Sequence, residues 1–244
     1  MNEEKFSGKA DDYDRYRPSY PTELVNWLFE KTNAKTVADI GAGTGKFTKL
    51  LIPKAEKVIA VEPNDDMLKK LYRNVPTAQV IKAPAENTGI PDGSVDLVTA
   101  ATAFHWFDEE KFKTECKRIL APNGRVAVIF NSKVVDDLIR ERDEISRIYC
   151  GYKGHAGKRS DNEGDAFLRN EYFAEVEYKE FEFSVSYDED SFVGNTLSRS
   201  YALKPDDIGY DGYVWELRQL FKKMNDFGSV ELKYKVTCYL GYFD

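Results

Sequence analysis

Three glycines, Gly41, Gly43 and Gly45, stand in the segment VADIGAGTGKFTKLL (37–51), directly after a short apolar run. Glycine lacks a Cβ, so it lets the backbone bend tightly and approach a ligand closely. In an open parallel sheet, ligands bind beyond the carboxyl ends of the strands, where a strand turns into its helix. We therefore expect a ligand at this turn, with a tight turn that binds nothing as the alternative.

The spacing of the glycines separates classes of ligand. A dinucleotide fingerprint requires G-x-G-x-x-G, but here the third glycine comes one residue early, and Lys46 occupies the fingerprint position. A phosphate-binding P-loop requires Lys followed by Ser or Thr, and the chain has no such pair at that spacing after the turn. A bound pyrophosphate or triphosphate is therefore not the best match.

An acid and a histidine follow two later apolar runs. Glu62 ends the run KVIAVEP (57–63), where a carboxylate can accept hydrogen bonds from both hydroxyls of a ribose. The alternative for Glu62 is an exposed acid at a strand end. His105 follows the run SVDLVTAATA (94–103) and is a candidate general base for a hydroxyl or amine. A contact to the substrate and simple packing are the alternatives for His105.

These residues must be held by a folded scaffold, and the first 130 residues show a regular pattern of elements. A helix is expected between Pro21 and Asn33, and short apolar runs then alternate with helical patterns. The apolar runs lie at 36–40, 57–63, 78–83, 94–103 and 125–130, and the helical patterns at 45–53, 64–74 and 108–120. This alternation predicts right-handed βαβ crossovers and a parallel sheet with helices on both faces.

The remaining residues follow a different pattern. Residues 132–150 are typical of a long polar-faced helix, and residues 151–166 of a glycine-rich mobile loop. Residues 175–187 and 231–243 alternate polar with apolar side chains around a helical stretch, which predicts an antiparallel edge on the sheet. The predicted fold is a doubly wound, Rossmann-like α/β domain. Its sheet is seven-stranded and mostly parallel with an antiparallel edge strand, and a small cap follows the fifth strand.

Composition limits the classes of function. The 244 residues are 42% hydrophobic, which is enough for a sizeable core. The formal charge of −7 argues against a nucleic-acid-binding surface. The three cysteines lie far apart, so we expect neither a disulfide framework nor a metal site. The N-terminus is charged and no apolar run reaches the length of a membrane span, so we expect a cytoplasmic protein.

Several segments together carry a resemblance to a known family. VADIGAGTGKFT, Glu62, APAENTGIPDGSVDLVTA and AFHWF resemble the successive motifs of class I S-adenosylmethionine-dependent methyltransferases. They are most similar to the small-molecule group related to trans-aconitate methyltransferases, the type 11 family. The opening FSGKADDYDRYRPSYP is similar to the N-terminal motif of that group. The resemblance covers the first 130 residues well and the rest in outline.

The resemblance implies S-adenosylmethionine as the cofactor and a set of contacts to it. Asp39, Gly41 and Gly43 match the motif at the methionine end, and Glu62 matches the acid that binds the ribose. Pro84 stands where many relatives have Asp, which removes one side-chain contact to the adenine. The other implied cofactor contacts are Tyr13, Arg17, Ala42, Thr44, Pro63, Met67, Ala85, Glu86, Thr102, Ala103 and Phe104. Arg17 is expected to pair with the methionine carboxylate, with a surface charge as the alternative.

The resemblance also implies a division of the single domain 1–244. Residues 1–33 would cover the cofactor, residues 34–130 would bind it, and residues 131–244 would form the acceptor side. His105 and Trp106 are expected at the acceptor. Arg199 and Tyr201 are hypothesised to receive an acidic acceptor, with a solvated arginine as the alternative.

The implied activity is methyl transfer to a small molecule, including carboxylic acids, without a nucleic-acid, membrane or metal partner. One alternative is an NAD-dependent oxidoreductase, suggested by the Tyr-x-x-x-Lys pair Tyr149 and Lys153, although Gly151 and Gly154 interrupt the helix that such a pair requires. Another alternative is a module that binds S-adenosylmethionine without turnover, because a fold does not by itself determine a function.

Overall fold

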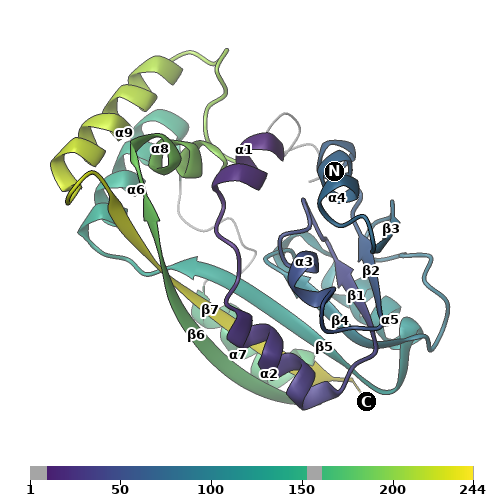
Figure 1. The fold of residues 1–244 in the computed structure, drawn as a ribbon. Coiled ribbons are helices and arrows are strands. Elements are labelled where there is room, and N and C mark those ends of the chain that lie inside the picture. Colours follow the sequence, from purple (N-terminus) through teal and green to yellow (C-terminus); the bar gives the residue numbers. More distant parts are fainter. Residues whose placement is uncertain (1–9, 153–160, 244) are drawn as a thin grey trace.

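The computed structural model describes residues 10–152 and 161–243, and within them seven strands form one sheet (Figure 1). The strand order is β3-β2-β1-β4-β5-β7-β6. The strands are β1 (Thr36–Ile40), β2 (Lys57–Val61), β3 (Gln79–Ile81), β4 (Val95–Ala101), β5 (Leu120–Lys133), β6 (Glu175–Tyr187) and β7 (Val230–Tyr242). Strands β1 to β5 pair in parallel, which confirms the predicted doubly wound sheet.

The antiparallel part of the sheet is formed by β7. This strand pairs antiparallel with both β5 and β6, for example through Val128 with Tyr239 and Phe181 with Val236. The predicted antiparallel strand is therefore present, and it lies between β5 and β6, next to the edge of the sheet. All three strands are long and extend beyond the short central strands (Figure 1).

Helices cover both faces of the sheet, as two consecutive residues of β2 show. Val58 packs with Leu28 in one apolar cluster, whereas Ile59 packs with Phe112 in another. Both Leu28 and Phe112 are fully buried. The first face carries α2 (Thr22–Thr32), α3 (Thr48–Leu51) and α4 (Asp65–Asn74), and the second carries α5 (Glu109–Ile119).

The helices of the cap lie at the far ends of β6 and β7 (Figure 1). A separate apolar cluster joins them to these strands. Tyr187 of β6 and Leu232 of β7 belong to it, together with Phe192, Tyr213 and Leu217 from the helices. The cap consists of α6 (Asp137–Cys150), α8 (Glu189–Leu197) and α9 (Tyr210–Met224). Helix α1 (Ala10–Tyr16) lies between the cap and α4.

Two predicted elements of the first half differ from the structure. The helix predicted for 45–53 is limited to α3, because Gly45 has a φ of +88° that an α-helix cannot include. Residues 121–124, between the predicted helix 108–120 and the predicted strand 125–130, form an irregularity within β5, since Val95 pairs with Leu120 and Leu97 already with Arg125. No helix in the described part of the chain has the length and apolar character of a membrane span.

Two boundaries also differ in the second half. The helix predicted for 132–150 begins later, because residues 132 and 133 still belong to β5 and the Asp136 side chain caps α6 by accepting the Ile139 N–H. Of the predicted mobile loop, residues 153–160 lie outside the described residues. Its last residues instead begin α7 (Asp161–Phe167), which is followed by the π-helical turn η3 (Leu168–Tyr172).

Candidate functional site

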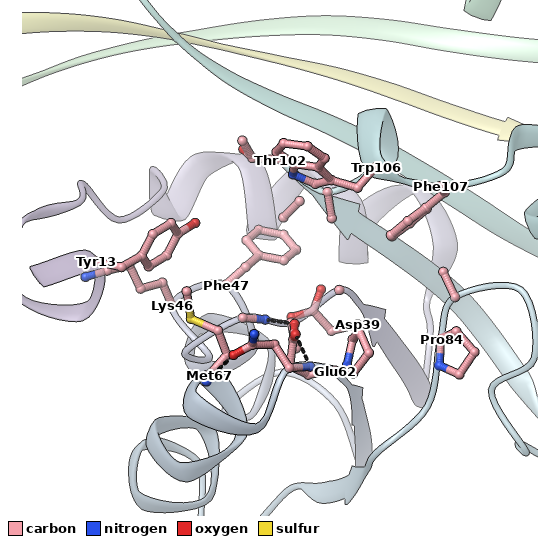
Figure 2. A pocket seen from close by; sticks show the side chains of 18 of the residues that line it. Tyr13, Asp39, Lys46, Phe47, Glu62, Met67, Pro84, Thr102, Trp106 and Phe107 are labelled. Carbon is pink, nitrogen blue, oxygen red and sulfur yellow. Dashed lines mark hydrogen bonds between the residues drawn. The ribbon is translucent and has the colours of Figure 1, made fainter. Parts of the chain in front are cut away.

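A pocket of about 250 Å³ lies at the carboxyl ends of β1, β2 and β4 (Figure 2). Ligands bind at this edge in open α/β sheets. Most of the residues predicted from the sequence line it, namely Tyr13, Asp39, Gly41, Ala42, Gly43, Glu62, Pro63, Met67, Ala85, Glu86, Thr102, Ala103 and Trp106. The fold thus brings residues from α1, from the ends of β1, β2 and β4 and from the loop after β3 to one cavity.

The glycine turn forms one wall of the pocket. The N–H groups of Gly41 and Ala42 both donate to the Val61 carbonyl oxygen, at 2.9 and 3.0 Å, so the turn is tied to the end of β2. A Cβ on Gly41 would lie 2.6 Å from the Cβ of Ala103, whereas a Cβ on Gly43 would meet no atom within 4 Å. Gly41 is therefore required by close packing, and Gly43 leaves open space beside the pocket.

Glu62 is a buried carboxylate, 7% exposed, at the end of β2. One of its oxygens accepts the Gly43 N–H at 2.8 Å, and the other accepts the Asn64 N–H at 2.9 Å. Glu62 thus holds the glycine turn and the start of α4 in place while it lines the pocket (Figure 2). Each carboxylate oxygen has two acceptor sites, so these bonds leave capacity for hydroxyl donors from a ligand.

Asp39, the neighbouring carboxylate, is only 1% exposed. Its two oxygens accept hydrogen bonds from the hydroxyls of Thr48, at 2.6 Å, and Thr99, at 2.8 Å. Burial raises the pKa of Asp39 to about 6, although both hydrogen bonds act in the opposite direction. A positively charged ligand group beside Asp39 would favour its ionised form.

Helix α1 closes one side of the pocket with Tyr13 (Figure 2). The Lys46 ammonium, which follows the glycine turn, donates to the Asp14 carbonyl oxygen. The Asn74 side chain donates to both the Asp14 carboxylate and the Thr44 carbonyl oxygen, each at 2.8 Å. The position of Tyr13 is therefore coupled to the glycine turn and to the end of α4.

Aromatic side chains form the opposite wall. Trp106 belongs to the short 3₁₀-helix η2 (Phe104–Trp106) after β4, and with Phe107 it lines the pocket (Figure 2). Thr102, just before η2, has a φ of +55°, which is rare for a β-branched residue. Its hydroxyl and the Tyr20 hydroxyl share a hydrogen bond of 2.9 Å. Strained backbone of this kind is common at functional sites.

Three predicted residues near the turn and η2 do not line the pocket. Thr44 is buried, and its hydroxyl has no hydrogen-bond partner within the described ranges. Phe104 packs in the core, with its ring 5.1 Å from that of Tyr172. His105 is partly exposed, and its ring centroid lies 4.7 Å from that of Trp106. Within η2, Trp106 is partly exposed and lines the pocket, whereas Phe104 is buried in the core.

The predicted arginines lie outside the pocket as well. The Arg17 Nε donates to the Ser198 hydroxyl at 2.9 Å, and its guanidinium lies 5.3 Å from the centre of the Tyr13 ring. Arg17 thus reaches toward the cap rather than into the pocket. Arg199 and Tyr201 follow α8, and the Arg199 guanidinium lies 5.9 Å from the Tyr201 ring.

The pocket also contains residues for which we predicted no role. These are Pro18, Tyr20, Lys46, Phe47, Asn64, Pro84, Ala101 and Phe107. Nearly all of them stand within or beside the motifs quoted above, so their position in the sequence was a usable signal. Their residue types were not a usable signal. Aromatic residues, for example, are 14% of the chain, and a motif does not reveal which of them face a cavity.

Comparison with known proteins points to one family. Residues 38–128, which contain the glycine turn, Glu62 and η2, match the family model of a methyltransferase domain. An uncharacterized methyltransferase of Mycobacterium tuberculosis is 32% identical over 198 residues, which are 81% of this chain and 77% of that protein. An uncharacterized methyltransferase-like protein of Schizosaccharomyces pombe is 30% identical over 204 residues, and the match covers 81% of this chain and 79% of that protein.

The fold is shared with solved structures. The structure of a candidate type II methyltransferase from Anaeromyxobacter dehalogenans superposes with a TM-score of 0.70 at 27% sequence identity. The match covers 93% of this chain and 98% of that one. The similarity therefore includes the cap and β5 to β7, and not only the half that carries the motifs.

Proposed function

Because this chain belongs to the class I S-adenosylmethionine-dependent methyltransferases, we propose that it transfers the cofactor's methyl group to a small-molecule acceptor by in-line displacement. The observation that carries the proposal is the convergence of the glycine turn, Asp39 and Glu62 on one pocket. When bound, S-adenosylmethionine supplies a methyl group on a positively charged sulfur. The protein then needs to orient the reactants and exclude water, rather than to create an electrophile.

The chain's own residues fit this cofactor. We propose that Gly41, Gly43 and Asp39 hold its methionine end, since Gly43 leaves open space and Asp39 offers a carboxylate to the ammonium group. Glu62 would accept the ribose hydroxyls, for which its acceptor capacity is sufficient. The adenine would lie among the apolar lining residues Pro63, Met67 and Ala85.

The aromatic walls would contribute to the reaction by positioning. Tyr13, Tyr20, Trp106 and Phe107 line the pocket from two sides, where they exclude water and can face a cation with their rings. Correct alignment of reactants can supply roughly 7 to 11 kcal/mol of the barrier. This is the main contribution that we assign to the protein.

The need for a base depends on the acceptor. A carboxylic acid is ionised at neutral pH and needs none, and it is the first acceptor class that we propose to test. For a hydroxyl or amine acceptor, we propose His105 as the general base, because it adjoins Trp106 at the pocket. Because the chain belongs to the methyltransferase family, we do not propose the NAD-dependent oxidoreductase that the sequence offered as an alternative.

Replacing Glu62 tests the proposed cofactor site. We expect Glu62→Ala to weaken S-adenosylmethionine binding roughly 10- to 100-fold, because it removes charge-assisted hydrogen bonds to the ribose and releases the glycine turn. Titration calorimetry with S-adenosylmethionine and with NAD measures this loss. Glu56→Ala is the matched control, since the Glu56 side chain is 71% exposed on the other end of the same strand.

Equal affinities in Glu62→Ala and Glu56→Ala would contradict the assigned site. A screen of methyl transfer over carboxylic acids, amines and phenols then tests turnover. Tight cofactor binding without transfer to any acceptor would instead support a module that binds the cofactor and does not catalyse.

A further inference from the structure

Four cationic side chains from distant segments meet in the cap. Arg17 follows α1, Lys133 ends β5, Arg142 lies on α6 and Arg199 follows α8. Arg142 is 2% exposed and the other three are partly buried. We call these four residues the cationic cluster. Such a gathering is unusual in a chain with a formal charge of −7.

The charges of the cluster act on one another. Burial lowers the pKa of Lys133 well below its usual range, and the positive charges of Arg142, Arg199 and Arg17 lower it further. Burial also lowers the pKa of Arg17, and the charge of Arg199 acts in the same direction. The four cations are therefore close enough to repel one another.

The described residues supply little negative charge in return. Arg142 pairs with Asp143 through its Nε, at 3.0 Å, and one Nη. Within residues 10–152 and 161–243, neither Arg17 nor Lys133 has an ion pair, and their hydrogen bonds go to Ser198 and Asn195. Burying a positive charge without a counter-charge is unfavourable, so an anion at this place would stabilise the charged forms of these side chains.

One donor of the cluster and one of the neighbouring Tyr201 have no acceptor among the described residues. The Arg142 Nη1 and the Tyr201 hydroxyl are buried and make no hydrogen bond in the described part of the chain. The Tyr201 phenol is near enough to act on the charge of Arg142, and its ring stacks on that of Tyr152 at 4.4 Å. An arginine fork and a phenol together suit the oxygens of a carboxylate or a phosphate.

The cluster adjoins the cofactor pocket through Arg17. The Arg17 guanidinium lies over the ring of Tyr13, which lines the pocket, and its charge also acts on Tyr20. On its other side, Arg17 contacts Ser198 next to Arg199. A small molecule held by the cluster can therefore extend past Tyr13 toward the pocket.

We propose that the cationic cluster binds a carboxylate or phosphate group of the methyl acceptor, and that this group is an anchor distinct from the atom that is methylated. The inference rests on the proposed methyl transfer. An oxygen held by several cations is a poor nucleophile, because they stabilise its negative charge. Methylating it would also remove that negative charge, which the excess positive charge of the cluster attracts. The acceptor therefore carries an anionic anchor and a separate nucleophilic atom.

Binding of simple anions tests the anchor. Titration calorimetry at constant ionic strength compares succinate, its neutral diamide and inorganic phosphate on the full chain. We expect saturable binding of succinate or phosphate, no binding of the diamide, and roughly 10- to 100-fold weaker anion binding in Arg142→Gln and Arg199→Gln. Arg140→Gln is the matched control, because Arg140 lies on α6 and its side chain is 66% exposed. The anion that binds more tightly, succinate or phosphate, shows whether the anchoring group is a carboxylate or a phosphate.

The affinity of each variant for S-adenosylhomocysteine separates the two proposals. Unchanged affinity together with lost anion binding supports the anchor, whereas intact anion binding without any cofactor binding would refute only the proposed function. Anion binding that is equal in wild type and both variants would overturn the anchor. If a variant does not fold, the comparison of ligands on the wild type still tests the anchor. Equal binding of succinate and its diamide to the wild type would also overturn the anchor. A transfer product in which the sole anionic group is methylated would refute the separate anchor.

Discussion

Asp39 and Glu62 are two buried carboxylates of one pocket, yet their hydrogen-bond partners differ. Glu62 accepts two backbone N–H groups, one from the glycine turn and one from the start of α4. Asp39 accepts from the hydroxyls of Thr48 and Thr99, which can rotate to serve either protonation state. Because burial raises its pKa to about 6, Asp39 is a group whose charge we expect to depend on pH and on the ligand.

Replacing Asp39 tests this at the level of stability. Its pKa is raised by burial from 3.8 to about 6, so the folded state binds the proton more tightly than the unfolded state. The stability that Asp39 contributes is then full below pH 4 and is lost as the pH rises through 6, by about 3 kcal/mol. We expect Asp39→Asn to unfold at a higher temperature than wild type at pH 7 and at a similar temperature at pH 4.

Thermal unfolding of both proteins between pH 4 and 7 measures this difference. A constant difference over that range would contradict the raised pKa. In the same series, the ionised Asp39 should favour the cofactor's ammonium group. We expect S-adenosylmethionine affinity to fall as the pH drops below 6 in wild type, by up to about tenfold per pH unit, and to vary less in Asp39→Asn.

At the scale of elements, α1 connects the two halves of the site. It contacts the glycine turn through Lys46 and Asp14, and it packs against α8 through the ring of Tyr16. The Asn195 side chain also donates to the Tyr16 carbonyl oxygen, at 2.9 Å. The same short helix thus positions Tyr13 at the pocket and Arg17 at the cationic cluster.

Gly194 makes this packing possible. A Cβ at this position would lie 2.4 Å from ring atoms of Tyr16, so Gly194→Ala must displace α1 from α8. We expect a loss of roughly 1 to 3 kcal/mol in the free energy of unfolding and weaker binding of S-adenosylmethionine, since Tyr13 moves with the helix. Denaturant unfolding and titration calorimetry measure the two effects.

Gly164→Ala is the control for that substitution. Gly164 also lies in a helix, α7, but a Cβ there would meet no atom within 4 Å. Gly164→Ala should stabilise the protein by roughly 0.5 to 1 kcal/mol, because alanine is a better helix former than glycine. Equal effects of the two substitutions would show that contact with Tyr16 is not what constrains Gly194.

At the scale of the whole molecule, the long strands unite the cofactor half and the cap. Strands β6 and β7 contribute to the cluster beneath α2 and also to the cluster beneath the cap helices. Phe183 of β6 packs against both clusters. The elements around the proposed cofactor pocket and those around the cationic cluster therefore pack on one continuous sheet.

This continuity predicts that the chain unfolds as one unit. We expect differential scanning calorimetry to show a single transition whose calorimetric and van't Hoff enthalpies agree. Separate loss of the cap would require β6 and β7 to break in the middle of their ladders, which exposes core from both clusters. Two resolved transitions would contradict the single domain, and a lower first transition in Leu217→Ala, a change confined to the cluster beneath the cap helices, would assign that transition to the cap.

Much of the site could be predicted because its signals are local in sequence. The alternation of apolar runs with helical patterns determines the parallel half of the sheet, and the carboxyl ends of parallel strands meet at one edge. The glycine turn and Glu62 each follow a strand directly, so their meeting at the pocket follows from the fold class. The boundaries of α3 and α6 could not be predicted as well, because single residues such as Gly45 and Asp136 determine them.

The amino-acid sequence by itself determined the fold class, the family resemblance and the strand-end residues, because each depends on residues close together in the chain. Only the tertiary structure decided that Arg17 turns toward Ser198, 181 positions away, and that Lys133, Arg142 and Arg199 gather beside it. It also decided that β7 lies between β5 and β6. Contacts of this kind depend on how whole elements pack, and no local pattern of residue types encodes which distant side chains will share a buried space.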